Sequence, residues 1–416
     1  MKSNLKTVFV GVSGGVDSSV SAALLKEATP KNFQKLFGRP TPKGFKGYNV
    51  VGVFIRTWTP DFIECTWQSE RRDAMRVCAH LDIPFLECDA EDAYKKGVAD
   101  YMIEEYKKGN TPNPDVMCNR EVKFGVFWQF AKERGADFIA TGHYTVKDLL
   151  HTDSSFQSSL TPFLGVPKNG TPPPVAFQGL SVLRKSPDLS KDQSYFLWTL
   201  TQDDLAHTLF PVGHLQKTEV RKLAEKYKLP VATKKDSQGV CFLGPLDMKD
   251  FLKHYIESKK GDVLLQEKGP ARGKIIGEHD GAIFFTLGER HGFTIFKNVD
   301  ESKPLYVVAK DIINNTITVS HKSDLWLEAR TSPTGTSNNT VLCSNTNWIG
   351  EIPLKNKLYT AQIRYHGDLL ECKVNYIGQT SADGVEIIFD KNVLVDKGQS
   401  IVIYDGDICL GGCIVV

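Results

Sequence analysis

The 416-residue sequence lacks the features that would place it in a membrane or outside the cell. No apolar run approaches the roughly 20 residues that a membrane-spanning helix needs, so we expect no membrane partner. The first residues, MKSNLK, lead directly into a predicted strand and leave no room for a signal or transit peptide. These absences predict a cytoplasmic protein.

Metal-ligand and disulfide patterns are missing as well. The nine cysteines are dispersed without a CxxC pair, and there is no HExxH motif. In a reducing cytoplasm such cysteines do not form a disulfide framework, and we expect no metal centre built by the protein alone. The formal net charge is only +2. A nucleic acid would therefore have to be bound by a local basic face and not by the whole surface.

The most informative segment that is present is TVFVGVSGGVDSSV, residues 7–20. Its apolar run predicts a strand buried on both faces, and a helical pattern follows from Val16 to Leu25. Between them, Gly14 and Gly15 can turn tightly and present N–H groups at a helix N-terminus, where anions bind. The loop has neither the Walker lysine nor the GxGxxG spacing. With Asp17 and three serines nearby we interpret it as a phosphate cradle; the alternative is a plain strand-to-helix turn.

Strands and helices alternate over the first 145 residues. This pattern predicts a doubly wound, Rossmann-like parallel sheet with helices on both faces. Ligands bind such sheets at the carboxyl ends of the strands, where the glycine loop and Gly142-His143 both lie. Residues 29–47 and 148–180 are rich in polar residues, Pro and Gly, so we expect two surface excursions, the second a flexible insertion.

After Gly261 the helical periodicity fades, and short alternating segments separated by turn residues follow. Such segments are typical of a small antiparallel barrel. The sequence thus predicts an α/β catalytic domain over 1–238, a small central domain over 239–305 and a C-terminal antiparallel β-barrel over 306–416. Residues 331–347 are expected to form a polar loop.

Two cysteines stand in polar segments that could carry chemistry. Residues 109–115, GNTPNPD, contain two prolines that block a helix, and they deliver Asp115 and Cys118 just ahead of one. A helix N-terminus favours the thiolate of a nearby cysteine; the alternative is a structural turn with a buried thiol. Cys241, in DSQGVCF, is either a second reactive thiol or a core cysteine. Spacing cannot show that the two thiols meet.

The densest basic stretch is Lys217 to Lys235, where cations flank an apolar helical stripe. Two interpretations stay open for it, a patch that tracks nucleic-acid phosphates and a solvated helix face. Upstream, KDQSYF at 191–196 places charge and an amide beside aromatic residues at a predicted helix start.

Together these motifs resemble the bacterial and organellar tRNA-specific 2-thiouridylases, which place sulfur on the wobble uridine of certain tRNAs. The likeness runs over most of the chain. The motifs that carry it are SGGVDSS at 13–19, TPNPDVMCN at 111–119, ATGHY at 140–144, KDQSYFL at 191–197, DSQGVCF at 236–242, IRYHG at 363–367 and GQS at 398–400. SGGVDSS is similar to the loop of all ATP-pyrophosphatases, whereas the two cysteine motifs are more specific.

The resemblance implies that ATP adenylates the uracil 2-oxygen and that sulfur then displaces AMP. Cys241 would carry a persulfide loaded by an external donor, and Cys118 would be the nucleophile. The reaction would leave a Cys118–Cys241 disulfide that a reductant reopens, with Asp115 as the proton shuttle. The implied partners are the anticodon stem-loop of tRNA and a sulfur-relay protein or cysteine desulfurase.

The resemblance also assigns binding residues. For ATP with its Mg²⁺ they are Gly11, Val12, Ser13, Gly14, Gly15, Val16, Asp17, Ser18, Ile55 and Gly142. For the target base and tRNA they are Asn113, Pro114, Asp115, His143, Lys191, Asp192, Gln193, Arg364, Tyr365 and Gln399. Ile55 stands where a methionine commonly contacts the nucleotide, a swap of one apolar group for another.

Two other functions compete with this one. An amide-forming synthetase that adenylates a small carboxylate would share the glycine loop, but it would need no pair of cysteines and would release pyrophosphate without tRNA. An RNA-binding module could keep the fold and lack catalysis, and failure to bind ATP would favour it.

Overall fold

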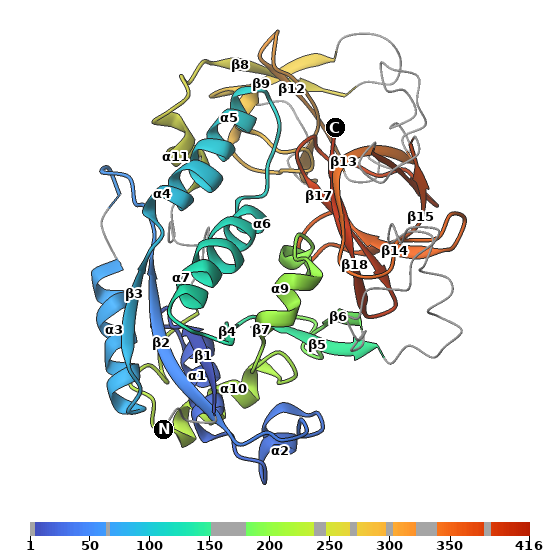
Figure 1. The fold of residues 1–416 in the computed structure, drawn as a ribbon. Helices are drawn as coiled ribbons and strands as arrows, with labels where there is room; N and C mark the ends of the chain where they lie inside the picture. The colour runs from blue at the N-terminus through green and yellow to red at the C-terminus, as the bar shows by residue number, and fades with distance from the viewer. Residues whose placement is uncertain are drawn as a thin grey trace.

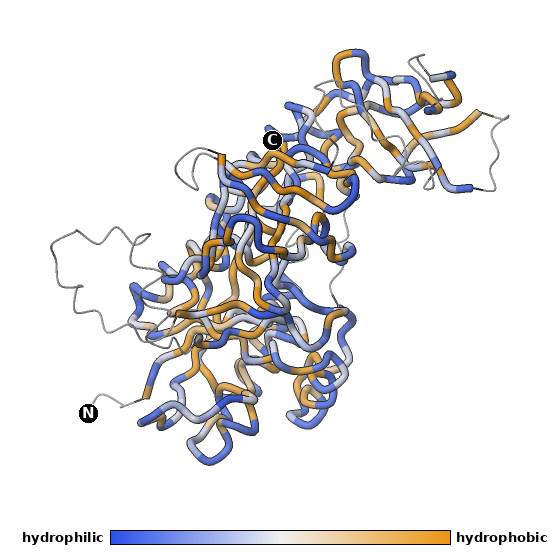
Figure 2. Tube along the Cα trace, turned by 90° about the vertical axis from the view of Figure 1, so that its right-hand side faces the viewer, coloured by the Kyte–Doolittle hydropathy of each residue, from blue (hydrophilic) through white to orange (hydrophobic). Residues whose placement is uncertain are grey.

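The computed structural model describes residues 5–63, 67–150, 180–236, 247–266, 273–296, 303–321, 339–377 and 384–416. These residues form a parallel sheet, a mixed middle sheet and an antiparallel barrel sheet, which confirms the predicted fold class (Figure 1). Figure 2 shows an elongated molecule in which apolar stretches run through the interior of each part. In the described residues, every helix is too short or too polar to cross a membrane.

The first sheet has the strand order β3-β2-β1-β4-β7, and all its neighbours are parallel. Its strands are β1 Lys6–Gly11, β2 Tyr48–Arg56, β3 Phe85–Asp89, β4 Phe138–Ala140 and β7 Thr208–Leu209. The chain runs outward from β1 through β2 in one direction and through β4 in the other. Such a switch point opens a crevice at the carboxyl ends of β1 and β4.

Both faces of this sheet are covered, so its central strands are apolar throughout. On one face Val8 and Val10 pack against α1 Val16–Glu27, α3 Trp67–His80 and α10 Lys217–Lys226. On the other face Phe9 packs against a helical layer. That layer consists of α4 Glu91–Tyr94, a π-helical turn at Lys95–Asp100, α5 Tyr101–Lys107, α6 Pro114–Cys118, a second π-helical segment at Asn119–Val126 and α7 Phe127–Glu133.

One helix begins earlier than the prolines suggested. Helix α6 starts at Pro114, so Asp115 and Cys118 lie inside a helix and not ahead of one. Proline is tolerated at the first helical position because its missing N–H has no intrahelical partner there. Asn113 caps the helix, with its Oδ1 accepting a hydrogen bond from the Val116 N–H at 3.2 Å. The expectation of a non-helical segment through Asp115 was therefore wrong.

Short helices connect the larger elements. They are α2 Phe33–Phe37 within the excursion over 29–47, a 3₁₀ turn at Ser194–Leu197, α9 Gln202–His207, α11 Met248–Lys253 and a second 3₁₀ turn at Ala282–Phe284. The first of these folds part of the excursion onto the core, since Phe33 and Phe37 are buried with α1.

The middle sheet has the order β10-β9-β8-β12-β11. Its strands are β8 Gly261–Leu265, β9 Lys274–His279, β10 Phe293–Ile295, β11 Leu305–Asp311 and β12 Thr316–His321. Strand β12 pairs in parallel with β8. Residues 306–321 consequently complete the middle sheet, whereas the sequence boundary at 306 assigned them to the barrel. Alternating apolar residues predict a strand, but they do not say which sheet it joins.

The barrel runs β13-β16-β15-β14-β17-β18 and closes through β13–β18. Its strands are β13 Thr340–Trp348, β14 Tyr359–Gln362, β15 Leu369–Tyr376, β16 Val385–Phe389, β17 Ser400–Asp405 and β18 Ile408–Val415. Residues 340–347, expected as loop, form most of β13 because Val341 and Cys343 alternate into the core. Cys409 and Cys413 are buried in β18.

A hairpin from the catalytic domain extends the barrel sheet. Strands β5 Thr145–Leu150 and β6 Leu180–Lys185 pair with each other, and β6 pairs with β18 through Arg184 opposite Ile408. The ends of the predicted insertion over 148–180 are therefore strand, and its remaining residues, 151–179, lie outside the described residues.

Candidate active site

The glycine loop follows β1 and leads into α1. Gly14 has a φ of +72°, and a Cβ there would lie 2.6 Å from the Glu70 carbonyl oxygen, so only glycine fits. Ser18 Oγ donates to the Gly15 carbonyl at 3.2 Å and lies 3.3 Å from Ser13 Oγ. Gly15 is the N-cap, and no side chain caps the helix. The first amides of a twelve-residue helix thus face the loop, as an anion site requires.

The other predicted nucleotide residues lie at the same edge of the sheet. Gly142 follows β4, and a Cβ on it would come within 2.8 Å of the Ser18 amide nitrogen. Ile55 is buried near the end of β2, and its Cδ1 would lie 3.7 Å from a Cβ on Gly11. The carboxyl ends of β1, β2 and β4 therefore bring these residues together around the first turn of α1.

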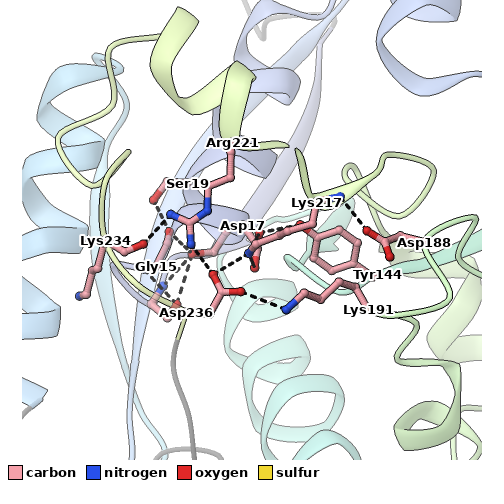
Figure 3. Close-up of polar contacts among 12 residues, drawn as sticks. Gly15, Asp17, Ser19, Tyr144, Asp188, Lys191, Lys217, Arg221, Lys234 and Asp236 are labelled. Carbon is pink, nitrogen blue, oxygen red and sulfur yellow. Dashed lines mark hydrogen bonds and ion pairs between the residues drawn. The ribbon is translucent and has the colours of Figure 1, made fainter. Parts of the chain in front are cut away.

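Asp17, in that first turn, is held by a lysine and a tyrosine (Figure 3). Lys217 Nζ lies 2.7 Å from Asp17 Oδ1 and 2.8 Å from Oδ2, and the Tyr144 hydroxyl donates to Oδ1 at 2.7 Å. Burial and the Asp17 charge raise the pKa of Tyr144, so its hydroxyl remains a donor. The Lys217 side chain is only 14% exposed, which makes this ion pair part of the cradle wall.

Asp236 joins three cations beside the cradle. Its carboxylate accepts from Lys217 at 2.9 Å, Lys191 at 3.1 Å and Arg221 at 2.5 Å. Burial opposes its ionisation, but the hydrogen bonds to Lys217 and Lys191 outweigh burial and lower its pKa to about 2. Figure 3 shows Lys191, Lys217 and Arg221 directed at this carboxylate.

This network changes the interpretation of the basic stretch over 217–235. Lys217 and Arg221 pair with Asp236, and Lys234 Nζ lies 2.8 Å from Asp73 Oδ2. Sequence reasoning missed Lys217 as a site residue because its partner Asp17 is 200 positions away. Lys222 and Lys226 stay exposed on α10. Only the exposed lysines remain candidates for a phosphate-tracking surface.

The predicted catalytic pair Asp115 and Cys118 lies on α6. Cys118 is fully buried. It is the fifth residue of the helix, beyond the first turn where the dipole acts, so the expected dipole effect on its thiolate does not apply. Cys241 lies outside the described residues, so the predicted disulfide is not shown.

Residues 191–196 connect the cradle to α6. Lys191 bonds Asp236 at one end, and at the other the Phe196 carbonyl accepts from Nδ2 of Asn119, the residue after α6, at 3.1 Å. Between them, Gln193 Oε1 accepts from the Tyr144 N–H at 3.0 Å, and the Gln193 N–H donates to the Tyr144 carbonyl at 2.9 Å. The segment therefore contacts both the network around Asp236 and the residue that follows the cysteine helix.

Asp192 points inward within this segment. Its carboxylate accepts from the Ser186 N–H at 2.8 Å and from the Ser194 hydroxyl at 2.7 Å. Burial is the largest effect on this carboxyl and raises its pKa. A contact of Asp192 with tRNA stays a prediction.

The barrel residues predicted to contact tRNA make contacts within the protein. The Tyr365 ring is 4.2 Å from the Phe196 ring and is partly exposed. Burial lowers the pKa of Arg364, which donates to the Leu287 and Leu394 carbonyls. Gln399 Nε2 donates to the Thr111 carbonyl at 2.8 Å. Arg364 and Gln399 thus bind neighbouring backbone, and their contact with tRNA stays a prediction.

A buried ion pair joins the three domains next to the TPNPD segment. Lys310 Nζ, from β11, lies 2.7 Å from Asp396 Oδ2 of the barrel, with the two side chains 8% and 4% exposed. The Thr111 hydroxyl donates to the same oxygen at 2.8 Å. Thr111 precedes Asn113 by two residues, so this junction holds the segment that leads into α6. No motif in the sequence indicated it.

His143, predicted to contact tRNA, is buried between Phe124 and Phe210. Its Nδ1 lies 2.8 Å from the Thr141 hydroxyl. Burial, with a smaller effect of Lys123, lowers its pKa well below the usual value, so the ring is neutral in the folded state.

This burial predicts an acid dependence of stability. Below about pH 6.5 the unfolded chain binds a proton at His143 that the folded chain does not, so the free energy of unfolding falls as pH falls. His143→Gln should remove up to about 1.4 kcal/mol per pH unit of that slope. Urea unfolding between pH 7.5 and 5.5 measures it, with the buried His279 left in place as a background contribution. An equal slope in both proteins would contradict the prediction.

Comparison with known proteins places the chain in a family. Residues 6–38 and 44–245 match the model of a tRNA methyl transferase HUP domain, 249–321 that of a tRNA methyl transferase PRC-barrel domain, and 338–415 that of an aminomethyltransferase beta-barrel domain. A tRNA-specific 2-thiouridylase MnmA of Lacticaseibacillus paracasei is 37% identical over 414 residues, covering 99% of this chain and 94% of that protein. The chain belongs to the MnmA family of tRNA-specific 2-thiouridylases.

Other MnmA proteins match over a similar length. The one from Bacillus subtilis is 35% identical over 413 residues, covering 97% of this chain and 93% of that protein. The one from Stenotrophomonas maltophilia is 38% identical, covering 98% and 93%. The predicted resemblance is therefore confirmed at the level of the MnmA family.

Proposed function

We propose that this protein thiolates the wobble uridine of tRNA at the 2-position, using ATP and a persulfide. One observation carries the proposal: Lys191 pairs with Asp236 beside the cradle, and five residues later the Phe196 carbonyl accepts from Asn119, which directly follows the helix with Asp115 and Cys118. A nucleotide site beside a thiol is what adenylation followed by sulfur transfer needs. Full-length similarity to MnmA proteins supports tRNA as the substrate.

In the first step the uracil 2-oxygen attacks the α-phosphate of ATP, and pyrophosphate leaves. The α1 amides and the Lys217 ammonium would stabilise the charge that develops on the leaving phosphates. Asp17 would hold Mg²⁺ together with the phosphates. Mg²⁺ commonly takes one or two carboxylates plus phosphate oxygens, so a single aspartate beside the phosphates is enough to hold it. The described residues include no cluster of three protein ligands. The ion would neutralise phosphate charge.

In the second step the terminal sulfur of a Cys241 persulfide attacks C2 and expels AMP. The Cys118 thiolate then attacks the Cys241 sulfur, which breaks the sulfur–sulfur bond, leaves the thiocarbonyl on the base and forms a Cys118–Cys241 disulfide. A reductant reopens that disulfide, and Asp115 would move the proton. The base reaches such a pocket out of its stack, which an anticodon loop permits at low cost. The sulfur would come from a relay protein or a cysteine desulfurase.

Mass spectrometry of tRNA nucleosides tests the function directly. A strain that lacks this gene should lose 2-thiouridine at the wobble position and regain it on complementation. Unchanged 2-thiouridine would overturn the proposal. Pyrophosphate release with a small carboxylic acid and no tRNA would favour the synthetase instead, and purified protein that does not bind ATP would favour an RNA-binding module.

Lys217 gives a more local test of the cradle. Lys217→Met should raise the KM for ATP at least about tenfold, because it removes a cation from the phosphate site and leaves Asp17 without its ion pair. Asp17→Ala should also weaken ATP use, while tRNA binding persists. The matched control is Lys222→Met, an exposed lysine on the same helix. In a pyrophosphate-release assay, we expect only the two cradle variants to raise the KM for ATP tenfold or more. Equal KM values for Lys217→Met and Lys222→Met would contradict a role of Lys217 in binding ATP.

A further inference from the structure

A cavity lies on the catalytic domain, away from the cradle. Its volume is about 140 Å³, and Leu25, Phe37, Arg39, Tyr48, Lys147 and His214 are among its lining residues. Leu25 is in the last turns of α1, whereas the cradle precedes its first turn. At 1.5 Å per residue the two places are about 15 Å apart along the helix. This cavity is therefore separate from the proposed nucleotide site.

Two cations face this cavity without a carboxylate partner among the ion pairs of the described residues. Lys147 Nζ donates to the Leu205 carbonyl at 2.6 Å, and the Arg39 guanidinium lies 5.6 Å over the Phe33 ring. Burial and the nearby Arg39 charge lower the pKa of Lys147 to about 8. Asp148 also lines the cavity; its carboxylate lies 3.6 Å from Arg184, which pairs more closely with Asp407 at 2.9 Å. The lining therefore carries two cations and one carboxylate, an excess of positive charge.

The remaining polar groups of the cavity are suited to an anion. Burial raises the pKa of Tyr48, so its hydroxyl stays a donor. Burial is the largest effect on His214 and lowers its pKa, with Glu219 opposing and Arg39 adding to the shift. A guanidinium fork, an ammonium and a hydroxyl around one small space supply donors in the arrangement that phosphate oxygens accept. Two like charges that share a cavity are also stabilised by an anion between them.

We propose that this cavity binds a phosphate group, from a free phosphate ion or from the tRNA backbone. Arg39 belongs to residues 39–43, which fall between the two matched parts of the HUP domain, so the site depends on this chain's own excursion. The cavity also shares a wall with a predicted tRNA contact. Phe210 lines it, and the Phe210 ring lies 6.2 Å from the His143 ring.

Calorimetry with inorganic phosphate tests the site in the full-length protein. A non-hydrolysable ATP analogue is added first to fill the cradle, and its binding is recorded. A failure of the proposed ATP binding is then distinguished from a failure of phosphate binding in the cavity. We expect one further saturable phosphate site. Arg39→Met with Lys147→Met should weaken it at least about tenfold, and Arg39→Met alone, at a half-exposed position, serves if the double variant does not fold. Lys31→Met with Lys35→Met, two exposed lysines of the same excursion, is the matched control.

Absence of saturable phosphate binding in the wild type, or undiminished binding in the Arg39 and Lys147 variants, would overturn the proposal. A salt titration of tRNA binding then separates the two sources. A tRNA phosphate in the cavity predicts that the double variant lowers the slope of log K against log salt by about 0.7–0.9. An unchanged slope, together with lost phosphate binding, assigns the cavity to the free ion.

Discussion

Cys118→Ser should abolish 2-thiouridine formation and leave ATP affinity unchanged. Serine is nearly isosteric with cysteine, so α6 and the fully buried position are preserved. A hydroxyl, however, neither attacks a persulfide nor forms a disulfide. Cys241→Ser should give the same loss, because serine cannot carry persulfide sulfur. The measurements are nucleoside mass spectrometry on tRNA treated with each variant, and calorimetry with an ATP analogue.

Cys88→Ser is the matched control for this experiment. Cys88 is also fully buried in the catalytic domain, and burial raises the pKa of its thiol to about 12, which makes it unreactive. That variant should thiolate normally. Normal 2-thiouridine with the Cys118 variant would end the two-cysteine mechanism in its present form. Activity that is lost only in the Cys241 variant would leave Cys241 as the direct sulfur donor.

Lys310→Met should lower the free energy of unfolding by about 3–5 kcal/mol, the usual cost of leaving one partner of a buried ion pair uncompensated. The ammonium it removes also donates at 3.1 Å to the carbonyl of Phe285, which follows the 3₁₀ turn at Ala282–Phe284, so a second contact is lost. Chemical denaturation measures the loss. Thiolation should fall further than the folded fraction does, because Thr111 shares the Asp396 oxygen and leads directly into α6.

A double variant separates charge from packing at this junction. Lys310→Met with Asp396→Asn removes both charges and keeps an amide oxygen for the Thr111 hydroxyl. It should recover part of the stability lost in Lys310→Met alone, since no unpaired carboxylate remains buried. A double variant as unstable as the sum of the two single variants would show that the ion pair is not the source of the effect.

The strands of the catalytic domain could be predicted because their residues follow a local rule. Val8, Val10 and their neighbours are apolar in succession, and both faces of β1 are buried. The start of α6 could not be predicted in this way. Proline blocks a helix at interior positions but is favoured at the first helical position, and the cap at Asn113 shows that Pro114 takes the first position. Strand β13 was missed because its second half, Asn345 to Asn347, is polar.

The glycine cradle was predictable for the same reason, since its loop, cap and helix are consecutive in sequence. The ion pairs around it were not. In the sequence Lys217 cannot be told apart from a lysine on a solvated helix face. Only the folded chain brings it to Asp17 and Asp236. Similarly, Gln399 was assigned to tRNA, and the fold places its amide on the Thr111 carbonyl. Long-range partners of this kind leave no periodic trace in a sequence.

The pairing of β6 with β18 has a consequence for how the protein is made. Arg184 lies opposite Ile408, so the outer edge of the β5–β6 hairpin is completed by residues translated more than two hundred positions later. At about 5–20 residues per second, that edge waits for roughly ten to forty-five seconds with its backbone groups unpaired. Exposed strand edges recruit other strands. During synthesis, this hairpin is therefore a strand edge that we expect a chaperone to cover.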